Sequence, residues 1–259
     1  MSDRKIAFWF IALLSVLVLV PFLGETIFYS KGEPREAIVA YTMLESGNWI
    51  LPTNYGVEIA YKPPFLYWTI AVISSVLGGV TEFSARMPSA LAFLAMQLVF
   101  FSFVAKRKDV KTAFLTSILL LSSFEVHRAA VACRLDMLQV SLIVISLCLL
   151  FRWDEKNCKG IPWLAVLLMA CATLTKGPVG SIFPCLGIGV YQLLRGRSFG
   201  KGFLFTAGHR VTVPHSFGHL VLGSLSARRR GVCQFDAGRK YRTFLPENVL
   251  CIARESVVV

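Results

Sequence analysis

The sequence predicts an all-α integral membrane protein with about six transmembrane helices. Hydrophobic residues make up 55% of the 259 residues and charged residues only 16%, a composition that is rare for a soluble domain of this length. Long apolar segments alternate with short segments that hold most of the charge. The basic residues therefore separate apolar segments, so the net charge of +12 indicates membrane topology rather than nucleic-acid binding.

The first predicted span covers residues 6–23, directly after the basic pair Arg4 and Lys5. No small-residue cleavage site follows it, so a retained signal-anchor is favoured over a cleaved signal peptide. Five later spans are predicted, at residues 87–105, 112–124, 137–151, 161–174 and 181–194. Several of them are shorter than the roughly 20 residues that a spanning helix needs.

One further apolar segment, residues 65–80, is short enough to span the membrane or to lie in its interface. If it crossed, the basic cluster at 106–111 would lie outside. With 65–80 in the outer interface, the inner segments up to residue 201 hold twelve Lys or Arg and four Asp or Glu, against seven and eight outside. The positive-inside rule favours this second topology. It makes residues 24–86 an extracytoplasmic loop with interfacial helices.

Within this loop, residues 31–64 are rich in charge, Pro, Gly and aromatic side chains. Pro34 fits the first turn of a helix, with Glu33 near its N-cap and Gly47 at its end. We expect a short amphipathic helix lying on the membrane. Two interpretations of Glu33, Arg35 and Glu36 remain open: the charges cap the helix, or they form an acid beside a cationic site for a lipid-linked phosphate.

Other charged residues fall on the same predicted face. Lys62 could extend from an aromatic belt or bind a phosphate as a point charge. Arg134 and Asp136 could form a structural ion pair, and Lys176 could extend from a helix break, but charges at the edge of a span are often functional. With Arg128, they form a set that suits a substrate with a lipid tail and a phosphate head. The belt residues are Tyr55, Tyr61, Tyr67 and Trp68.

Residues 206–259 predict an irregular, basic tail, because they contain no apolar run long enough to span and no helical or strand period. His215 and His219 are four residues apart, as in half of a zinc site, but no further ligand is well spaced. We predict no metal site and no cofactor.

Six motifs occur in order between residues 32 and 178, and together they resemble membrane glycosyltransferases of the aminoarabinose-transferase and protein-mannosyltransferase superfamily. They are GEPREA (32–37), MLESGNWILP (43–52), YKPP (61–64), EFSARMPSA (82–90), RLDM (134–137) and TKGP (175–178).

The resemblance implies sugar transfer from a polyprenyl-phosphate donor to a lipid A-type or protein acceptor at the outer face of the bacterial inner membrane. It implies that Glu33 and Asp136 are the catalytic acids. Arg35 and Lys62 would bind the donor phosphate, and Lys176, which matches a recurrent family lysine, is grouped with them.

The sequence departs from the family in two ways. The family often has two adjacent acids at the head of the first loop, and the first of them falls on Gly32 here. Family members are also about twice as long, so residues 1–205 resemble only the N-terminal half, and residues 206–259 are expected to be out of frame. The alternative, a non-enzymatic transporter or scaffold, predicts functional polar residues near the bilayer midplane instead.

Overall fold

The computed structural model describes residues 3–30, 32–55 and 58–195; the predicted tail at 206–259 lies outside them. The described part is mostly helical and contains one two-stranded antiparallel sheet, β1 (Thr53–Asn54) with β2 (Glu58–Ile59). Its helices are α1 (Asp3–Leu19) with a 3₁₀ turn η1 (Val20–Phe22), α2 (Gly32–Ser46), α3 (Phe65–Leu77), α4 (Glu82–Arg107), α5 (Val110–Ser122), α6 (Phe124–Ala130), α7 (Leu135–Glu155), α8 (Trp163–Lys176) and α9 (Val179–Leu194).

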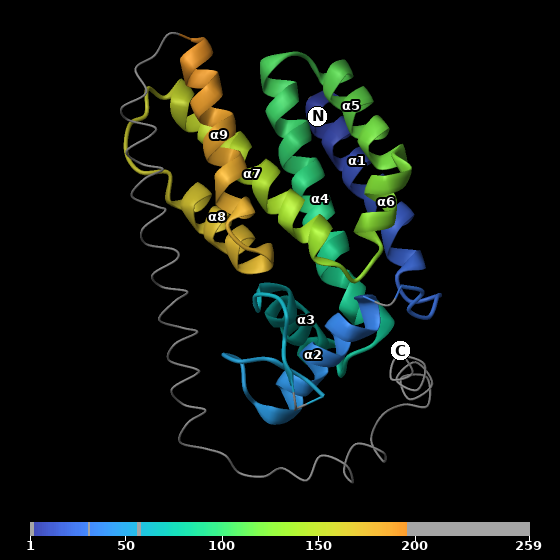
Figure 1. Ribbon diagram of the computed structural model, residues 1–259. Helices are drawn as coiled ribbons and strands as arrows, with labels where there is room; N and C mark the ends of the chain where they lie inside the picture. The colour runs from blue at the N-terminus through green and yellow to red at the C-terminus, as the bar shows by residue number, and fades with distance from the viewer. Residues whose placement is uncertain (1–2, 31, 56–57, 196–259) are drawn as a thin grey trace.

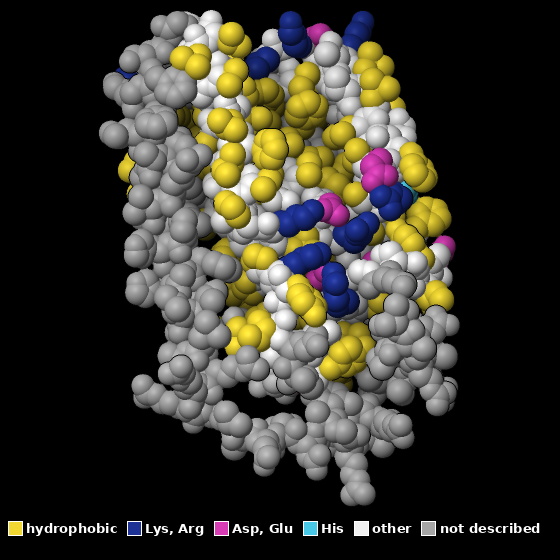
Figure 2. All heavy atoms as spheres, in the orientation of Figure 1, with side chains coloured by type: hydrophobic (Ala, Val, Ile, Leu, Met, Phe, Trp, Pro, Cys, Tyr) yellow, Lys and Arg dark blue, Asp and Glu magenta, His cyan; other side chains and the backbone are white. Residues whose placement is uncertain are grey.

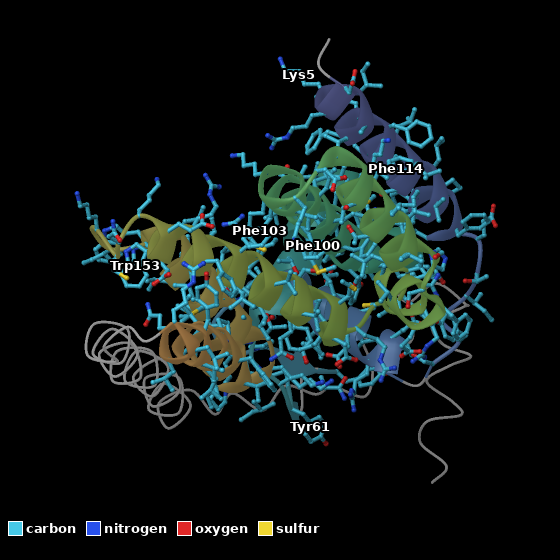
Figure 3. The ribbon with its side chains drawn as sticks, turned by 90° about the horizontal axis from the view of Figure 1, so that it is seen from above. Lys5, Tyr61, Phe100, Phe103, Phe114 and Trp153 are labelled. Atoms are coloured by element: carbon cyan, nitrogen blue, oxygen red, sulfur yellow. The ribbon has the colours of Figure 1, made fainter. Side chains whose placement is uncertain are left out.

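The long helices form a bundle, and α2 and α3 lie together at one end of it (Figure 1). Helix α7 packs against α4 and against both α8 and α9, so it connects the two halves of the bundle. In the view from above, α7 crosses the middle, with α1 and α5 toward one edge and α9 toward the other (Figure 3).

Three of the predicted spans contain a helix long and apolar enough to cross a membrane: α1 with η1, α4 and α7. The other three predicted spans correspond to the shorter apolar helices α5, α8 and α9. The helical character of all six segments is therefore confirmed, whereas the count of six spans stays a prediction.

Two helix boundaries differ from the sequence-based prediction for local reasons. Helix α4 begins at Glu82 rather than near residue 87, because Thr81 and Ser84 form a reciprocal capping box. The backbone becomes extended at Ser123, which ends α5, and the short helix α6 occupies part of the predicted outer loop 125–136.

The sequence predicted a short amphipathic helix for α2, with one apolar face. The structure differs, because α2 buries apolar side chains against α3 in two separate clusters. In one cluster, Ala37 and Ala40 pack with Leu66 and Ile70. In the other, α2 and α3 residues also meet; these are Val39, Met43, Tyr67 and Ala71. The alanines allow the two helices to approach closely. We call this unit the α2–α3 layer.

The charged side chains gather in two zones of the visible face (Figure 2). One zone lies at the end of the bundle that carries the N-terminus and the turn between α4 and α5. The other lies where the α2–α3 layer meets the bundle. Apolar side chains fill much of the visible surface between them. Large apolar side chains such as Leu13, Leu119 and Leu167 are exposed. An apolar surface between two charged zones is typical of a membrane protein.

Candidate functional site

A completely buried ion pair joins the start of α2 to α4. Arg86 of α4 donates from Nε to Oε1 of Glu33 in α2 over 3.0 Å, and neither side chain is more than 1% exposed. Glu33 also accepts hydrogen bonds from the backbone N–H groups of Cys133 (2.9 Å) and Tyr29 (3.3 Å). The carboxylate therefore connects α2 to α4 and to the turn before α7.

Arg86 also satisfies the backbone between α1 and α2. Its guanidinium donates to the carbonyl oxygens of Leu23 (2.9 Å), Thr26 (2.7 Å) and Ile27 (3.1 Å). Burying a guanidinium and a carboxylate is tolerable only when both are paired and hydrogen-bonded in this way. The Glu33–Arg86 pair thus determines where α2 begins relative to the bundle.

A second acid of α2, Glu36, lies between two of the predicted phosphate-binding cations. Its Oε1 accepts from Nζ of Lys62 over 3.1 Å and from the guanidinium of Arg35 over 3.3 Å. The Glu36 side chain is 3% exposed, whereas both cations are at least one third exposed. Its Oε2 is buried as well. Glu36 is therefore a buried acid that holds two partly exposed cations.

Two protonated side chains, the Tyr67 hydroxyl and the Cys133 thiol, lie near the buried acids of α2. Burial raises the pKa of the Tyr67 hydroxyl, and the negative charge of Glu36 raises it further. Burial likewise raises the pKa of the Cys133 thiol well above its usual range, with smaller contributions from Glu36 and Glu33. Neither the hydroxyl nor the thiol adds a negative charge at neutral pH. The charge around them is therefore that of the Glu33 and Glu36 carboxylates and the cations paired with these.

A second group of charges lies at the start of α7. Asp136 accepts from Nζ of Lys176, the last residue of α8, over 2.5 Å. The predicted ion pair with Arg134 is present but longer, at 3.8 Å. All three side chains are about half exposed, and Asp136 also feels the positive charge of Lys62. The two groups of charges therefore adjoin each other.

The structure thus brings together four cations from segments far apart in the sequence, with one buried acid and one exposed acid among them. We call them the cationic site; its members are Arg35, Lys62, Arg134, Lys176, Glu36 and Asp136. They belong to the charged zone where the α2–α3 layer meets the bundle (Figure 2). Arg128 instead pairs with Glu125 on α6, at the exposed surface.

The predicted site residues therefore fall into two environments. The cationic site contains Arg35, Lys62, Asp136 and Lys176, whereas Glu33 is buried and pairs with Arg86. Sequence reasoning missed the role of Arg86, although it lies inside a recognised motif, and it gave Glu36 no separate role. The described residues contain no group of three His, Cys, Asp or Glu side chains that could hold a metal ion.

Gly32, where the family often has an acid, is the first residue of α2. A Cβ atom built there would meet no other atom within 4 Å, and the backbone is not in the left-handed region. The structure therefore has room for a side chain at this position, directly beside Glu33.

Comparison with known proteins identifies relatives for most of the described chain. Residues 61–214 match the family model "Dolichyl-phosphate-mannose-protein mannosyltransferase". The undecaprenyl phosphate-alpha-4-amino-4-deoxy-L-arabinose arabinosyl transferase of Shewanella sediminis is 34% identical over 176 residues, which are 66% of this chain and 32% of the relative. The chain spans about a third of the length of such relatives.

Two crystal structures of ArnT from Cupriavidus metallidurans share the fold, one in the apo state and one bound to undecaprenyl phosphate. Each superposes with a TM-score of 0.66 and 23% sequence identity, over 80% of this chain and about two fifths of ArnT. The family model covers more than half of the 259 residues. The chain therefore belongs to the dolichyl-phosphate-mannose-protein mannosyltransferase family.

Proposed function

We propose that this chain is part of a glycosyltransferase that moves a sugar from a polyprenyl-phosphate donor to a lipid A-type or protein acceptor. The observation that carries this proposal is the cationic site, in which four Lys and Arg side chains surround two acids. A phosphate attached to a lipid matches this charge and its position beside an apolar surface. The charge distribution favours the outer face of the bacterial inner membrane as the location.

In the proposed mechanism, the donor phosphate takes the place of the Glu36 carboxylate as the main partner of Lys62 and Arg35. Arginine can contact two phosphate oxygens at once, and lysine contributes a compact positive charge. Until the donor arrives, Glu36 keeps both cations in position, because its Oε1 accepts hydrogen bonds from each. Lys176, which lies at Asp136, adds a third positive charge.

The reaction then needs an acid that the acceptor can reach. We assign this role to Asp136, because its side chain is 45% exposed beside Lys176 and Arg134. The acceptor hydroxyl attacks the anomeric carbon, the bond from that carbon to the phosphate oxygen breaks, and Asp136 takes the hydroxyl proton. The cations stabilise the negative charge on the departing polyprenyl phosphate.

The sequence-based prediction that Glu33 is also catalytic stays a prediction. Its complete burial and its pairing with Arg86 favour a positioning role, in which it holds the start of α2 so that Arg35 and Glu36 face Lys62. The non-enzymatic alternative receives less support, because on the face seen in Figure 2 most of the charged side chains gather in the two charged zones, with an apolar surface between them.

Lipid binding by the purified chain tests the donor proposal directly. We expect undecaprenyl phosphate to bind at least about tenfold more tightly than undecaprenol, because the two lipids differ only in the phosphate that the cationic site would hold. Quenching of tryptophan fluorescence in detergent can measure both affinities. Equal affinities would contradict the proposal.

Gly32→Asp tests whether the missing family acid limits the reaction. We expect this variant to fold, because a side chain fits at Gly32 and a carboxylate is favourable in the first turn of a helix. If a second acid assists the transfer, the rate of sugar transfer should rise about tenfold or more. Gly32→Asn is the matched control without charge, and equal rates for the two variants would show that an acid at this position is not limiting.

A further inference from the structure

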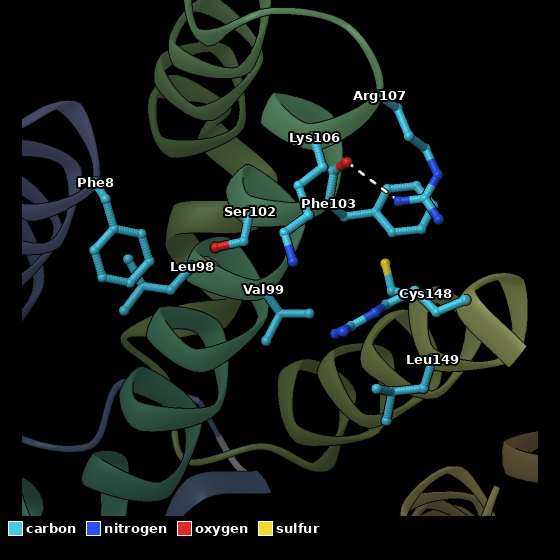
Figure 4. A pocket seen from close by; sticks show the side chains of 10 residues that line it. Phe8, Leu98, Val99, Ser102, Phe103, Lys106, Arg107, Cys148 and Leu149 are labelled. Atoms are coloured by element: carbon cyan, nitrogen blue, oxygen red, sulfur yellow. Dashed lines mark hydrogen bonds between the residues drawn. The ribbon is translucent and has the colours of Figure 1, made fainter. Parts of the chain in front are cut away.

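A second candidate binding site lies at the other end of the bundle, away from the cationic site. It is a half-open cavity of about 290 Å³ between α1, α4 and α7 (Figure 4). Its lining combines apolar side chains from all three helices with basic side chains from α4 and α7. The lining includes Leu98, Val99, Leu149, Lys106, Arg107 and Arg152.

The basic residues of the lining lie nearer the ends of α4 and α7 than the apolar ones do. Lys106 lies two turns of α4 beyond Leu98 and Val99, which is about 12 Å along the helix axis. On α7, Arg152 likewise follows Leu149 toward the helix end. In Figure 4 the Lys106 side chain reaches back over the cavity, toward Val99. A molecule that fills this space therefore needs a charged head and an apolar body.

The basic residues are in excess of the acids around them. Arg107 is already paired, since it donates to Glu155 over 2.9 Å and its guanidinium lies 3.5 Å from the centre of the Phe103 ring. In the part of the chain that the structure describes, neither Lys106 nor Arg152 has a carboxylate partner. Arg4 adds a further positive charge nearby, because it donates to the backbone carbonyl of Ser102. The cavity can thus accept an anion without breaking an existing ion pair.

We propose that this cavity binds the headgroup of an anionic phospholipid. The glycerophosphate would lie between Lys106 and Arg152, and the acyl chains would extend along the apolar side chains of α4 and α7 into the bilayer. A cavity of about 290 Å³ that is open on one side has room for the head and the first part of the chains. Basic pockets between transmembrane helices on the cytoplasmic side commonly bind such lipids.

This site does not depend on the proposed function. The predicted topology places the cavity on the cytoplasmic side, because it contains the basic ends of α4 and α7. The cationic site lies at the opposite end of the same helices, at Arg134 and Asp136 before and within the first turn of α7. A bound phospholipid would connect α1, α4 and α7 at the cytoplasmic surface, without contact with the sugar donor.

Native mass spectrometry of the full chain with phosphatidylglycerol or phosphatidylcholine of identical acyl chains tests the proposal. We expect the wild-type chain to bind phosphatidylglycerol about tenfold more tightly. The double variant Lys106→Gln/Arg152→Gln should lose this preference. The control Lys156→Gln/Lys159→Gln removes the same charge from the same end but outside the cavity, and it should bind as the wild type does.

A second variant separates the cavity from the charge. Val99→Trp fills the apolar part without changing a charge, so we expect it to weaken binding of both lipids about tenfold while its elution as a folded protein is unchanged. Equal losses in the two double variants would mean that the preference is only general surface attraction. Wild-type binding by Val99→Trp, or no preference in the wild type, would overturn the proposal.

Discussion

Replacement of Arg86 by Met is expected to lower the free energy of unfolding by about 3–5 kcal/mol. The substitution leaves the Glu33 carboxylate buried without its counter-charge, and it removes the donors to the carbonyl oxygens of Leu23, Thr26 and Ile27. Breaking one side of a fully buried pair is costly because the remaining charge cannot reach water. Unfolding in mixed micelles of increasing SDS content, followed by circular dichroism, measures the loss.

The matched control is Arg128→Met, which breaks an exposed ion pair with Glu125 within α6. Water screens that pair, so its loss should change stability little. The double variant Glu33→Gln/Arg86→Met should recover part of the stability lost in Arg86→Met, since no unpaired charge then remains. A loss no larger in Arg86→Met than in Arg128→Met would contradict the assignment of the buried pair as the link that fixes the start of α2 against α4.

Loss of charge in the cationic site should have the largest effect on catalysis. We expect Lys62→Ala and Asp136→Asn each to lower the rate of sugar transfer by about 10²–10³-fold. Lys62 would no longer stabilise the leaving phosphate, and Asp136 would no longer accept the hydroxyl proton. Transfer from an undecaprenyl-phosphate-linked sugar, measured in proteoliposomes that contain the acceptor, provides the rate.

Stability separates these catalytic effects from structural ones. Asp136 is partly exposed, so Asp136→Asn should unfold as the wild type does, and Lys159→Ala serves as a control at the opposite end of the bundle. Lys62→Ala removes one of the two cations that pair with the buried Glu36 carboxylate, so it should lose some stability as well as activity. Because Arg35 remains, this loss of stability should be smaller than in Arg86→Met. Glu33→Gln should lose activity and stability together if Glu33 is a positioning residue. If it loses activity while keeping full stability, Glu33 has the catalytic role that its motif predicts. Full activity in both Lys62→Ala and Asp136→Asn would contradict the proposed site.

The helices could be predicted from sequence because hydropathy is a local property. The apolar segments at 87–105 and 137–151 became α4 and α7, and errors at their ends were a few residues. The burial of α2 was harder to predict, because Val39 and Met43 contact Tyr67 and its neighbours across an intervening loop. A helix with apolar side chains on two faces looks only weakly amphipathic until its packing partner is known.

The sequence by itself determined that the chain is a helical membrane protein, that its charges lie at the two ends of its helices, and which family it resembles. Only the tertiary structure decided which acid has which surroundings. Glu33 pairs with Arg86 and is buried, whereas Glu36 meets Lys62 and Asp136 meets Lys176. These partners lie between 26 and 53 residues apart in the chain. Helical periodicity relates only residues within a few turns, so the packing of α2, α4, α7 and α8 had to bring them together.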